Sequence, residues 1–227
     1  MRINKTNLNF ASRNRTVRYA DDIARKVNVA FPRVSPSAAG HFNNAHNFLS
    51  LGVKLGRKMD NITRIAWNNC ITKEGYFQKI IGILEPIKRF KMGNCGEASQ
   101  VAAVAAKING IQDCRLASLY SKPKLGSGFI VELPVDLDHA VLYVENNGKP
   151  YVIDSWLGFA DFVPNALERY VKEYAKRLNL GKLTPEDIMI KPDELDNPYC
   201  KLFAKNPSGD ELEKLRRKYP ELIIERK

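Results

Sequence analysis

The sequence predicts an α+β fold in which a buried central helix packs on an antiparallel sheet, with extra helices at both ends of the chain. Helical patterns fill the first part of the chain and return at its end, and three strand-like segments follow one another in between. The last two of these segments are joined by Asn147-Gly148, a dipeptide typical of tight hairpins. Strands that are grouped together, with helices before and after them, favour the α+β class.

The first residues differ in composition from the rest. Residues 1–40 are polar and basic, and we interpret them as an N-terminal extension, which could be a flexible terminus or an arm that binds a partner. A short helix is expected over residues 18–29, before the prolines that follow. Residues 41–227 are expected to form one domain, since 227 residues suffice for one domain with extensions.

Apolar residues at helical spacing predict helices over residues 41–72 and 75–91. His41 and His46 lie five residues apart, and this is not the spacing that places two metal ligands on one helical face. From Asn94 onward the chain is rich in alanine, valine and serine, which predicts a helix that is apolar on nearly every side and therefore buried. Asn109-Gly110 is a typical helix end.

The remaining elements follow in order. Strands are expected over residues 115–120, 137–145 and 151–154. Apolar spacing predicts a helix over 164–180, and a charged, exposed helix is expected over 210–219. Between these helices, residues 184–187 should form a short helical turn, and residues 191–209, with three prolines, should form a loop.

Composition restricts the possible partners and locations. The formal net charge of +11 is compatible with an anionic partner or an anionic membrane surface. Nucleic acid is not an expected partner, because the basic residues are dispersed and carry no interleaved aromatic motif. No apolar run reaches the roughly 18 residues of a membrane span, and no apolar segment follows the basic N-terminus as in a Sec signal. We expect a cytoplasmic protein, or one secreted without a cleaved Sec signal.

The cysteines are widely spaced and include no CxxC pair, so neither a disulfide framework nor a zinc site is expected. We expect free thiols, no metal and no cofactor. The four positions are Cys70, Cys95, Cys114 and Cys200.

Cys95 differs from the other cysteines in its neighbours. It begins the small-residue helix between Asn94 and Gly96, where free backbone N–H groups and the helix dipole favour a thiolate. The same N–H groups can bind an oxyanion, so Asn94 and Gly96 are candidate oxyanion or substrate-binding residues. Gly93 and Gly96 leave the approach to the sulfur unobstructed. The alternative is a buried, inert cysteine, an interpretation that fits the other three.

His139 and Asp154 lie on the two strands of the expected hairpin. His139 alternates with Val141 and Tyr143, and Asp154 closes an otherwise apolar strand. Any odd hairpin register puts both side chains on one face, directly opposite or one diagonal step apart. Alone, each could be structural, as a core histidine or a strand-end aspartate. Together with Cys95 they form a nucleophile, base and orienting set.

Three segments resemble the papain-like cysteine hydrolases: Gly93-Asn94-Cys95-Gly96-Glu97, Asp138-His139-Ala140-Val141-Leu142 and Tyr151-Val152-Ile153-Asp154-Ser155-Trp156. They are most similar to the bacterial effector and toxin branch, which includes YopT-type cysteine proteases and related glutamine deamidases. The order Cys, His, Asp and the tryptophan soon after the aspartate match that branch. The resemblance covers roughly residues 90–160. It implies a papain-like catalytic domain over residues 41–227 and secretion into a host cell.

The resemblance implies a thiol-dependent acyl-transfer enzyme, a cysteine protease acting on a protein or peptide substrate. A glutamine deamidase or transglutaminase would use the same acyl-enzyme, and a non-catalytic basic binding module is the alternative from another class. The family often carries Gln or Asn five or six residues before the nucleophile, where this chain has Arg89 and Phe90. A side-chain oxyanion donor must then come from elsewhere. The candidates are Asn94, Asn68, Asn69 and Gln78. Trp156 could line the substrate groove or simply pack in the core.

Overall fold

The computed structural model describes residues 15–32, 45–122, 136–178 and 180–225, without the side chains of residues 45–57. Most of the expected N-terminal extension lies outside these ranges, as do His41 and the side chain of His46.

A five-stranded antiparallel sheet forms the centre of the described structure, in the order β4-β3-β2-β1-β5. Seven α-helices accompany it, so the expected α+β class and antiparallel sheet are confirmed. The three expected strands are present as β1 to β3, with ends that differ by at most one residue. The strands are β1 (Cys114–Ser121), β2 (Asp136–Val144), β3 (Tyr151–Asp154), β4 (Phe159–Phe162) and β5 (Ile188–Pro192).

The hairpin between β2 and β3 turns at Asn147-Gly148, as the sequence predicts. Both residues have positive φ, 47° and 73°, and the N–H of Lys149 donates to the carbonyl of Asn146 over 2.8 Å. Two consecutive left-handed residues give a turn whose twist matches that of the flanking strands. The register pairs Leu142 with Ile153.

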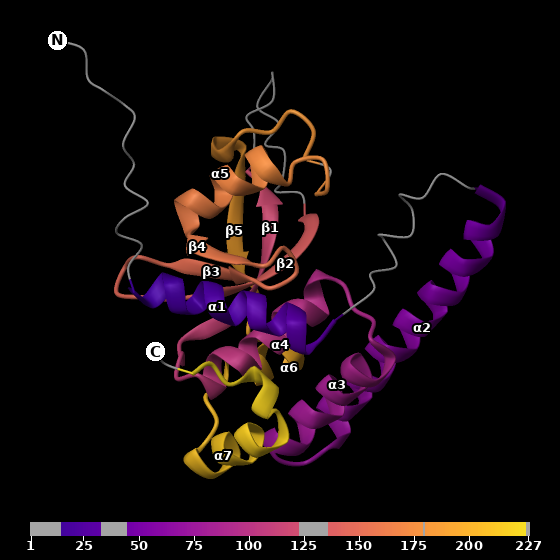
Figure 1. The fold of residues 1–227 in the computed structure, drawn as a ribbon, viewed down its shortest axis with the longest axis vertical. Helices are drawn as coiled ribbons and strands as arrows, with labels where there is room; N and C mark the ends of the chain where they lie inside the picture. Colours follow the sequence, from indigo (N-terminus) through magenta and orange to yellow (C-terminus); the bar gives the residue numbers. More distant parts are fainter. Residues whose placement is uncertain (1–14, 33–44, 123–135, 179, 226–227) are drawn as a thin grey trace.

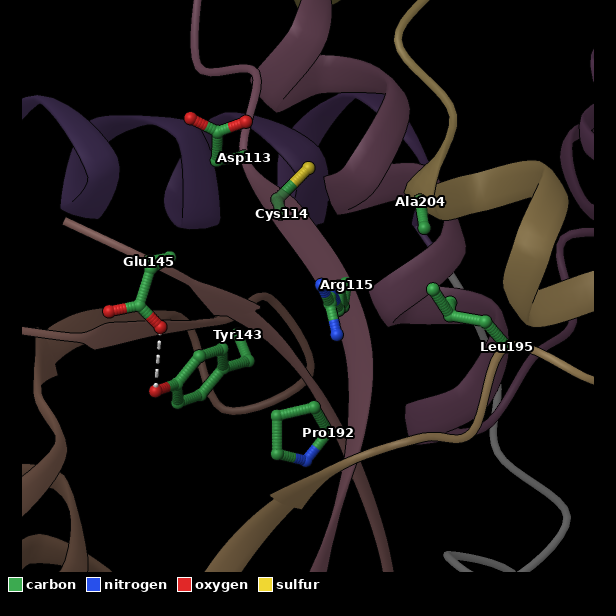
Figure 2. A pocket seen from close by; sticks show the side chains of 8 residues that line it. All are labelled: Asp113, Cys114, Arg115, Tyr143, Glu145, Pro192, Leu195 and Ala204. Carbon is green, nitrogen blue, oxygen red and sulfur yellow. Dashed lines mark hydrogen bonds between the residues drawn. The ribbon is translucent and has the colours of Figure 1, made fainter.

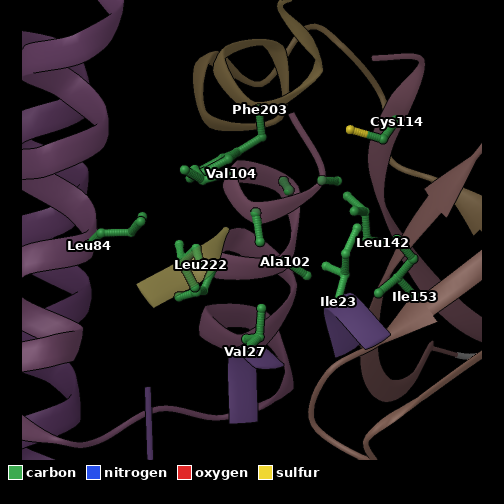
Figure 3. Close-up of a cluster of buried hydrophobic side chains, with 14 of the residues drawn as sticks. Ile23, Val27, Leu84, Ala102, Val104, Cys114, Leu142, Ile153, Phe203 and Leu222 are labelled. Atoms are coloured by element: carbon green, nitrogen blue, oxygen red, sulfur yellow. The ribbon is translucent and has the colours of Figure 1, made fainter. Parts of the chain in front are cut away.

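The sheet separates two layers of helices (Figure 1). Helices α1 (Arg15–Ala30) and α4 (Cys95–Ile108) cover one face, and α5 (Val163–Glu173) covers the other. Because side chains alternate along a strand, Leu142 and Ile153 point into the α1–α4 layer, as Figure 3 shows. Their neighbours on the other face pack with α5. As expected, α4 is almost completely buried.

Helix α1 confirms the helix expected over residues 18–29 and is built into the core. One of its faces is fully buried against α4, β3 and β4. Asp21 on this face forms an ion pair with Arg25, and its other oxygen accepts the N–H of Ala160 in β4 over 2.9 Å. This part of the expected extension is therefore a core element. The buried apolar side chains are Val17, Ala20, Ile23, Ala24 and Val27.

Helices α2 (Ala45–Thr72) and α3 (Tyr76–Phe90) form a pair that projects away from the sheet (Figure 1). The amide of Asn69 donates to the carbonyl of Gly82 over 2.7 Å, and a Cβ added at Gly82 would meet the Asn69 side chain at 2.7 Å. Glycine is thus required for this close approach. Asn69, one of the proposed oxyanion donors, is used for helix packing.

Several short elements differ from the sequence prediction. The four-residue strand β4 and the five-residue strand β5 were not expected, because segments this short carry little periodicity. The loop expected over 191–209 contains α6 (Pro198–Ala204), in which Pro198 occupies the first helical turn, where proline is favoured. Helix α5 ends at Glu173, and turns continue to residue 178. Helix α7 (Gly209–Lys218) and the short turn at Pro185–Asp187 match the prediction.

Candidate active site

Asn94 fixes the start of helix α4. Its side chain accepts the N–H of Glu97, and its own N–H donates to the Glu97 carboxylate over 2.8 Å. This reciprocal capping box makes Cys95 the first residue of the helix. The backbone N–H of Asn94 is therefore engaged by Glu97. Cys95 itself is half-buried, and its sulfur lies 3.7 Å from the carbonyl oxygen of Asp138.

His139 and Asp154 are in direct contact. The imidazole Nε2 lies 2.7 Å from Asp154 Oδ2, and the two side chains are only 1% and 0% exposed. Since Leu142 pairs with Ile153, Asp154 comes opposite Val141, and His139 is one diagonal step away. This is one of the two arrangements that the hairpin predicts.

The carboxylate of Asp154 is held by four hydrogen bonds. His139 and the Tyr170 hydroxyl bind Oδ2, the latter over 3.1 Å. The backbone N–H groups of Trp156 and Leu157 donate to Oδ1 over 3.1 and 2.8 Å. The turn after β3 and helix α5 thus fix the orientation of the group that binds the imidazole. No sequence pattern predicts the contribution of Tyr170, because this residue comes from a helix packed on the sheet.

The second imidazole nitrogen of His139, Nδ1, is available to interact with Cys95. Nδ1 is buried and has no hydrogen-bond partner among the described residues. Burial acts to lower the pKa of His139, but the Asp154 carboxylate and the adjacent Cys95 thiol outweigh it and raise the pKa to about 10. The imidazole therefore retains its proton at neutral pH. The protonated imidazole holds a proton that it can donate to a leaving group.

A β-bulge directs His139 toward Cys95. Between β1 and β2 the pairing passes from Ser118 opposite Ala140 to Tyr120 opposite Asp136, which leaves two extra residues in β2. Asp138 has a positive φ of 52°, and its N–H donates to the Asp136 carboxylate over 2.8 Å. Such bulges re-aim side chains next to active sites. The sequence analysis assumed a regular strand here. Aspartates at 136 and 138, which tolerate this geometry, are the signal that it missed.

Ser155 joins the strand segment that carries Asp154 to the helix that begins with Cys95. Its hydroxyl is buried and donates to the carbonyl of Ala98, in the first turn of α4, over 2.7 Å. The bond ties the residue after Asp154 to the helix that begins with Cys95. The sequence analysis did not assign this role to Ser155, because the contact spans 57 positions along the chain.

Trp156 and Gly96 are neighbours of the reacting groups: Trp156 lies near His139, and Gly96 follows Cys95 in the chain. The Trp156 ring is half-buried and 5.5 Å from the His139 ring, and Tyr170 contacts the imidazole edge-on at the same separation. The guanidinium of Arg177 lies 4.1 Å above the Trp156 ring. Gly96 borders open space, since a Cβ added there would meet no atom within 4 Å. The thiol can therefore be approached past Gly96.

A pocket of about 410 Å³ lies at the opposite end of the β1–β2 ladder and shares no residue with this site (Figure 2). Cys114 lines it, and burial raises the pKa of that thiol, so it is unsuited to nucleophilic chemistry. Within the described ranges, no group of His, Cys, Asp and Glu residues could hold a metal ion. The full lining is Asp113, Cys114, Arg115, Tyr143, Glu145, Pro192, Leu195 and Ala204.

No protein-family model matches the chain, and no curated protein or solved structure matches it at a significant level. None of the described helices combines the length and apolarity that crossing a membrane requires.

Proposed function

We propose that this protein is a cysteine protease that acts on a protein substrate, with Cys95 as nucleophile, His139 as base and Asp154 as the orienting group. One observation carries the proposal: a fully buried His–Asp hydrogen bond leaves the other imidazole nitrogen, beside a cysteine at a helix start, without a hydrogen-bond partner in the part of the chain that the structure describes. Each group is structural in many proteins, but the set has the connectivity of a catalytic triad.

In the proposed reaction the Cys95 thiolate attacks a carbonyl carbon of the substrate. His139 donates its proton to the leaving amine, and a thioester remains on Cys95. The imidazole, now neutral, accepts a proton from water as the water attacks the thioester, and hydrolysis releases the acid and restores the thiolate–imidazolium pair. Asp154 stabilises the charged imidazole throughout, because its carboxylate is held by Tyr170 and two backbone N–H groups.

The oxyanion would be bound by backbone groups. The N–H groups of Cys95 and Gly96 are the first two of helix α4, where a helix offers no intrahelical acceptor. A backbone-only oxyanion hole agrees with the lack of Gln or Asn at positions 89 and 90.

The same acyl-enzyme would serve deamidation or transamidation of a glutamine side chain, so the substrate determines the outcome. The resemblance of the segments around Cys95, His139 and Asp154 to the papain-like effector branch supports a papain-like fold and a protein substrate. The proposed location is the cytoplasm or, after secretion, a host cell.

Mass spectrometry of proteins and glutamine-containing peptides incubated with the enzyme tests the proposal. The comparison uses wild type, Cys95→Ala, and Cys200→Ala as a matched control at another half-buried cysteine. We expect backbone cleavage by wild type and Cys200→Ala and none by Cys95→Ala. Conversion of glutamine to glutamate, or amine incorporation, would assign the deamidase or transglutaminase alternative. If no product depends on Cys95 across these substrates, the non-catalytic binding module becomes the better account.

A further inference from the structure

Arg177 places a positive charge at the edge of the candidate active site. It lies in the turn after helix α5 and is exposed to solvent. Its guanidinium stacks on the Trp156 ring at 4.1 Å from the ring centre. The next residue, Leu178, is buried, and its N–H donates to the carbonyl of Tyr174 over 2.9 Å. The backbone that carries Arg177 is therefore anchored to the sheet layer.

The ring beneath Arg177 is fixed relative to the reacting groups. The N–H of Trp156 donates to Asp154, and the indole lies 5.5 Å from the His139 ring. The tryptophan thus contacts both the guanidinium of Arg177 and the imidazole of His139. Since an arginine stacked on an aromatic face keeps its N–H groups available at its edges, Arg177 can still donate to a carboxylate.

Two cations of helix α5 already have acidic partners. Arg169 of helix α5 lies 3.7 Å from Asp161 and 3.5 Å from Glu173, and Lys172 lies 3.2 Å from Glu168. Within the described ranges, no carboxylate forms an ion pair with Arg177. A fixed cation without an anion beside a reaction centre is suited to binding an anionic group of a ligand.

We infer that Arg177 is a specificity-determining residue that binds a substrate carboxylate close to the acyl group attacked by Cys95. The inference rests on the proposed function and adds no chemical step to it. It defines the substrate class as protein segments with Asp or Glu next to the reacting amide. The carboxylate would pair with the guanidinium edge while Trp156 holds that group in place.

Two alkylating reagents test the inference without a known substrate. Iodoacetamide is neutral and iodoacetate carries a carboxylate, and both transfer a similar group to a thiol. The ratio of their rate constants at Cys95, measured by peptide mass spectrometry, reports the preference of the site for an anion. The variant is Arg177→Gln. The matched control is Lys176→Gln, which removes the same charge from the neighbouring exposed residue.

We expect Arg177→Gln to lower the iodoacetate-to-iodoacetamide ratio about two- to fivefold, a size typical of an exposed ion pair. Lys176→Gln should leave the ratio nearly unchanged, and added salt should shrink the difference between wild type and Arg177→Gln. An unchanged ratio in Arg177→Gln, or an equal fall in Lys176→Gln, overturns the inference while the proposed function stands. If iodoacetamide does not react faster at Cys95 than at the other cysteines, the proposed function fails, and the inference fails with it.

Discussion

The buried polar groups near the two ends of helix α4 differ in their hydrogen-bond partners. At the C-terminal end, the Asn109 amide donates to the carbonyls of Ala105 and Leu222 over 2.7 and 2.8 Å, and its oxygen accepts the N–H of Ile224. The fully buried Lys107 donates a hydrogen bond to the side-chain oxygen of Asn206 over 3.1 Å. At the N-terminal end, the buried Nδ1 of His139 has no partner among the described residues.

This difference distinguishes the structural end of helix α4 from the end that carries the proposed active site. Buried polar groups normally have hydrogen-bond partners, because burying one without a partner costs free energy. The C-terminal end follows this rule and links α4 to the end of the chain. The N-terminal end departs from it at the nitrogen that faces a half-buried thiol, beside the open space at Gly96. The departure marks the end of the helix where chemistry is expected.

Among the variants that test the two ends of helix α4, Asp154→Ala should have the largest effect on stability, because it removes one partner of a fully buried pair. We expect a loss of about 3–5 kcal/mol in the free energy of unfolding, measured with urea. The reaction of Cys95 with iodoacetamide near neutral pH should also slow. Asp161→Ala is the matched control, since Asp161 is a buried carboxylate on the adjacent strand β4. A control that slows Cys95 equally would contradict the role assigned to Asp154.

Asn109→Ala tests the structural end. It removes an amide that binds two carbonyls and the N–H of Ile224, so we expect the free energy of unfolding to fall by about 2–3 kcal/mol. The iodoacetamide rate at Cys95 in the folded protein should not change. If Asn109→Ala slowed Cys95 as much as Asp154→Ala does, the two ends would not be functionally distinct.

The pH dependence of stability tests the charge on His139. Its pKa in the folded protein is raised to about 10, so the folded state binds more protons than the unfolded state above the usual histidine value near 6.5. Stability from the charged His139–Asp154 pair is complete below about 6.5 and is lost as pH rises toward 10. A loss of several kcal/mol is expected, since each pKa unit between the unfolded and the folded value corresponds to about 1.4 kcal/mol. The difference in unfolding free energy between wild type and His139→Gln should shrink over this window, and a constant difference would contradict the assignment.

Tyr170→Phe should have the smallest effect. It removes only the hydroxyl that donates to Asp154 Oδ2, so a loss of about 1 kcal/mol in unfolding free energy is expected. Tyr170 also affects His139 indirectly, because its hydroxyl helps to position the Asp154 carboxylate, which raises the pKa of the imidazole. The pH dependence of Cys95 alkylation should therefore shift in Tyr170→Phe. A stability loss without such a shift would leave Tyr170 a purely structural residue.

The sequence predicted the parts of the fold that depend on local patterns. The start of α4 follows from its run of small residues, and the hairpin follows from Asn147-Gly148. The register of that hairpin brought His139 and Asp154 together as expected. These features depend on neighbours in the chain or on one tight turn, so local rules suffice.

The remaining features depend on contacts between distant segments. The Tyr170 hydroxyl reaches Asp154 only because α5 packs on that face of the sheet, and Ser155 reaches Ala98 only because α4 packs on the other. The bulge at Asp138 depends on pairing with β1, which no local pattern specifies. Helix α1 looked like part of a polar extension because its exposed face is basic, although its other face is buried.

The central claim, that His139 activates Cys95, is tested most directly by comparing two cysteines with similar exposure in one protein. Cys95 and Cys200 are both half-buried, but burial and then the Asp193 carboxylate raise the pKa of Cys200 to about 11. The measurement is the iodoacetamide rate at each thiol near neutral pH, in wild type and His139→Gln. We expect Cys95 to react at least about tenfold faster than Cys200 in wild type, and most of that advantage to vanish in the variant. Equal rates in wild type, or an advantage that survives His139→Gln, would contradict the claim.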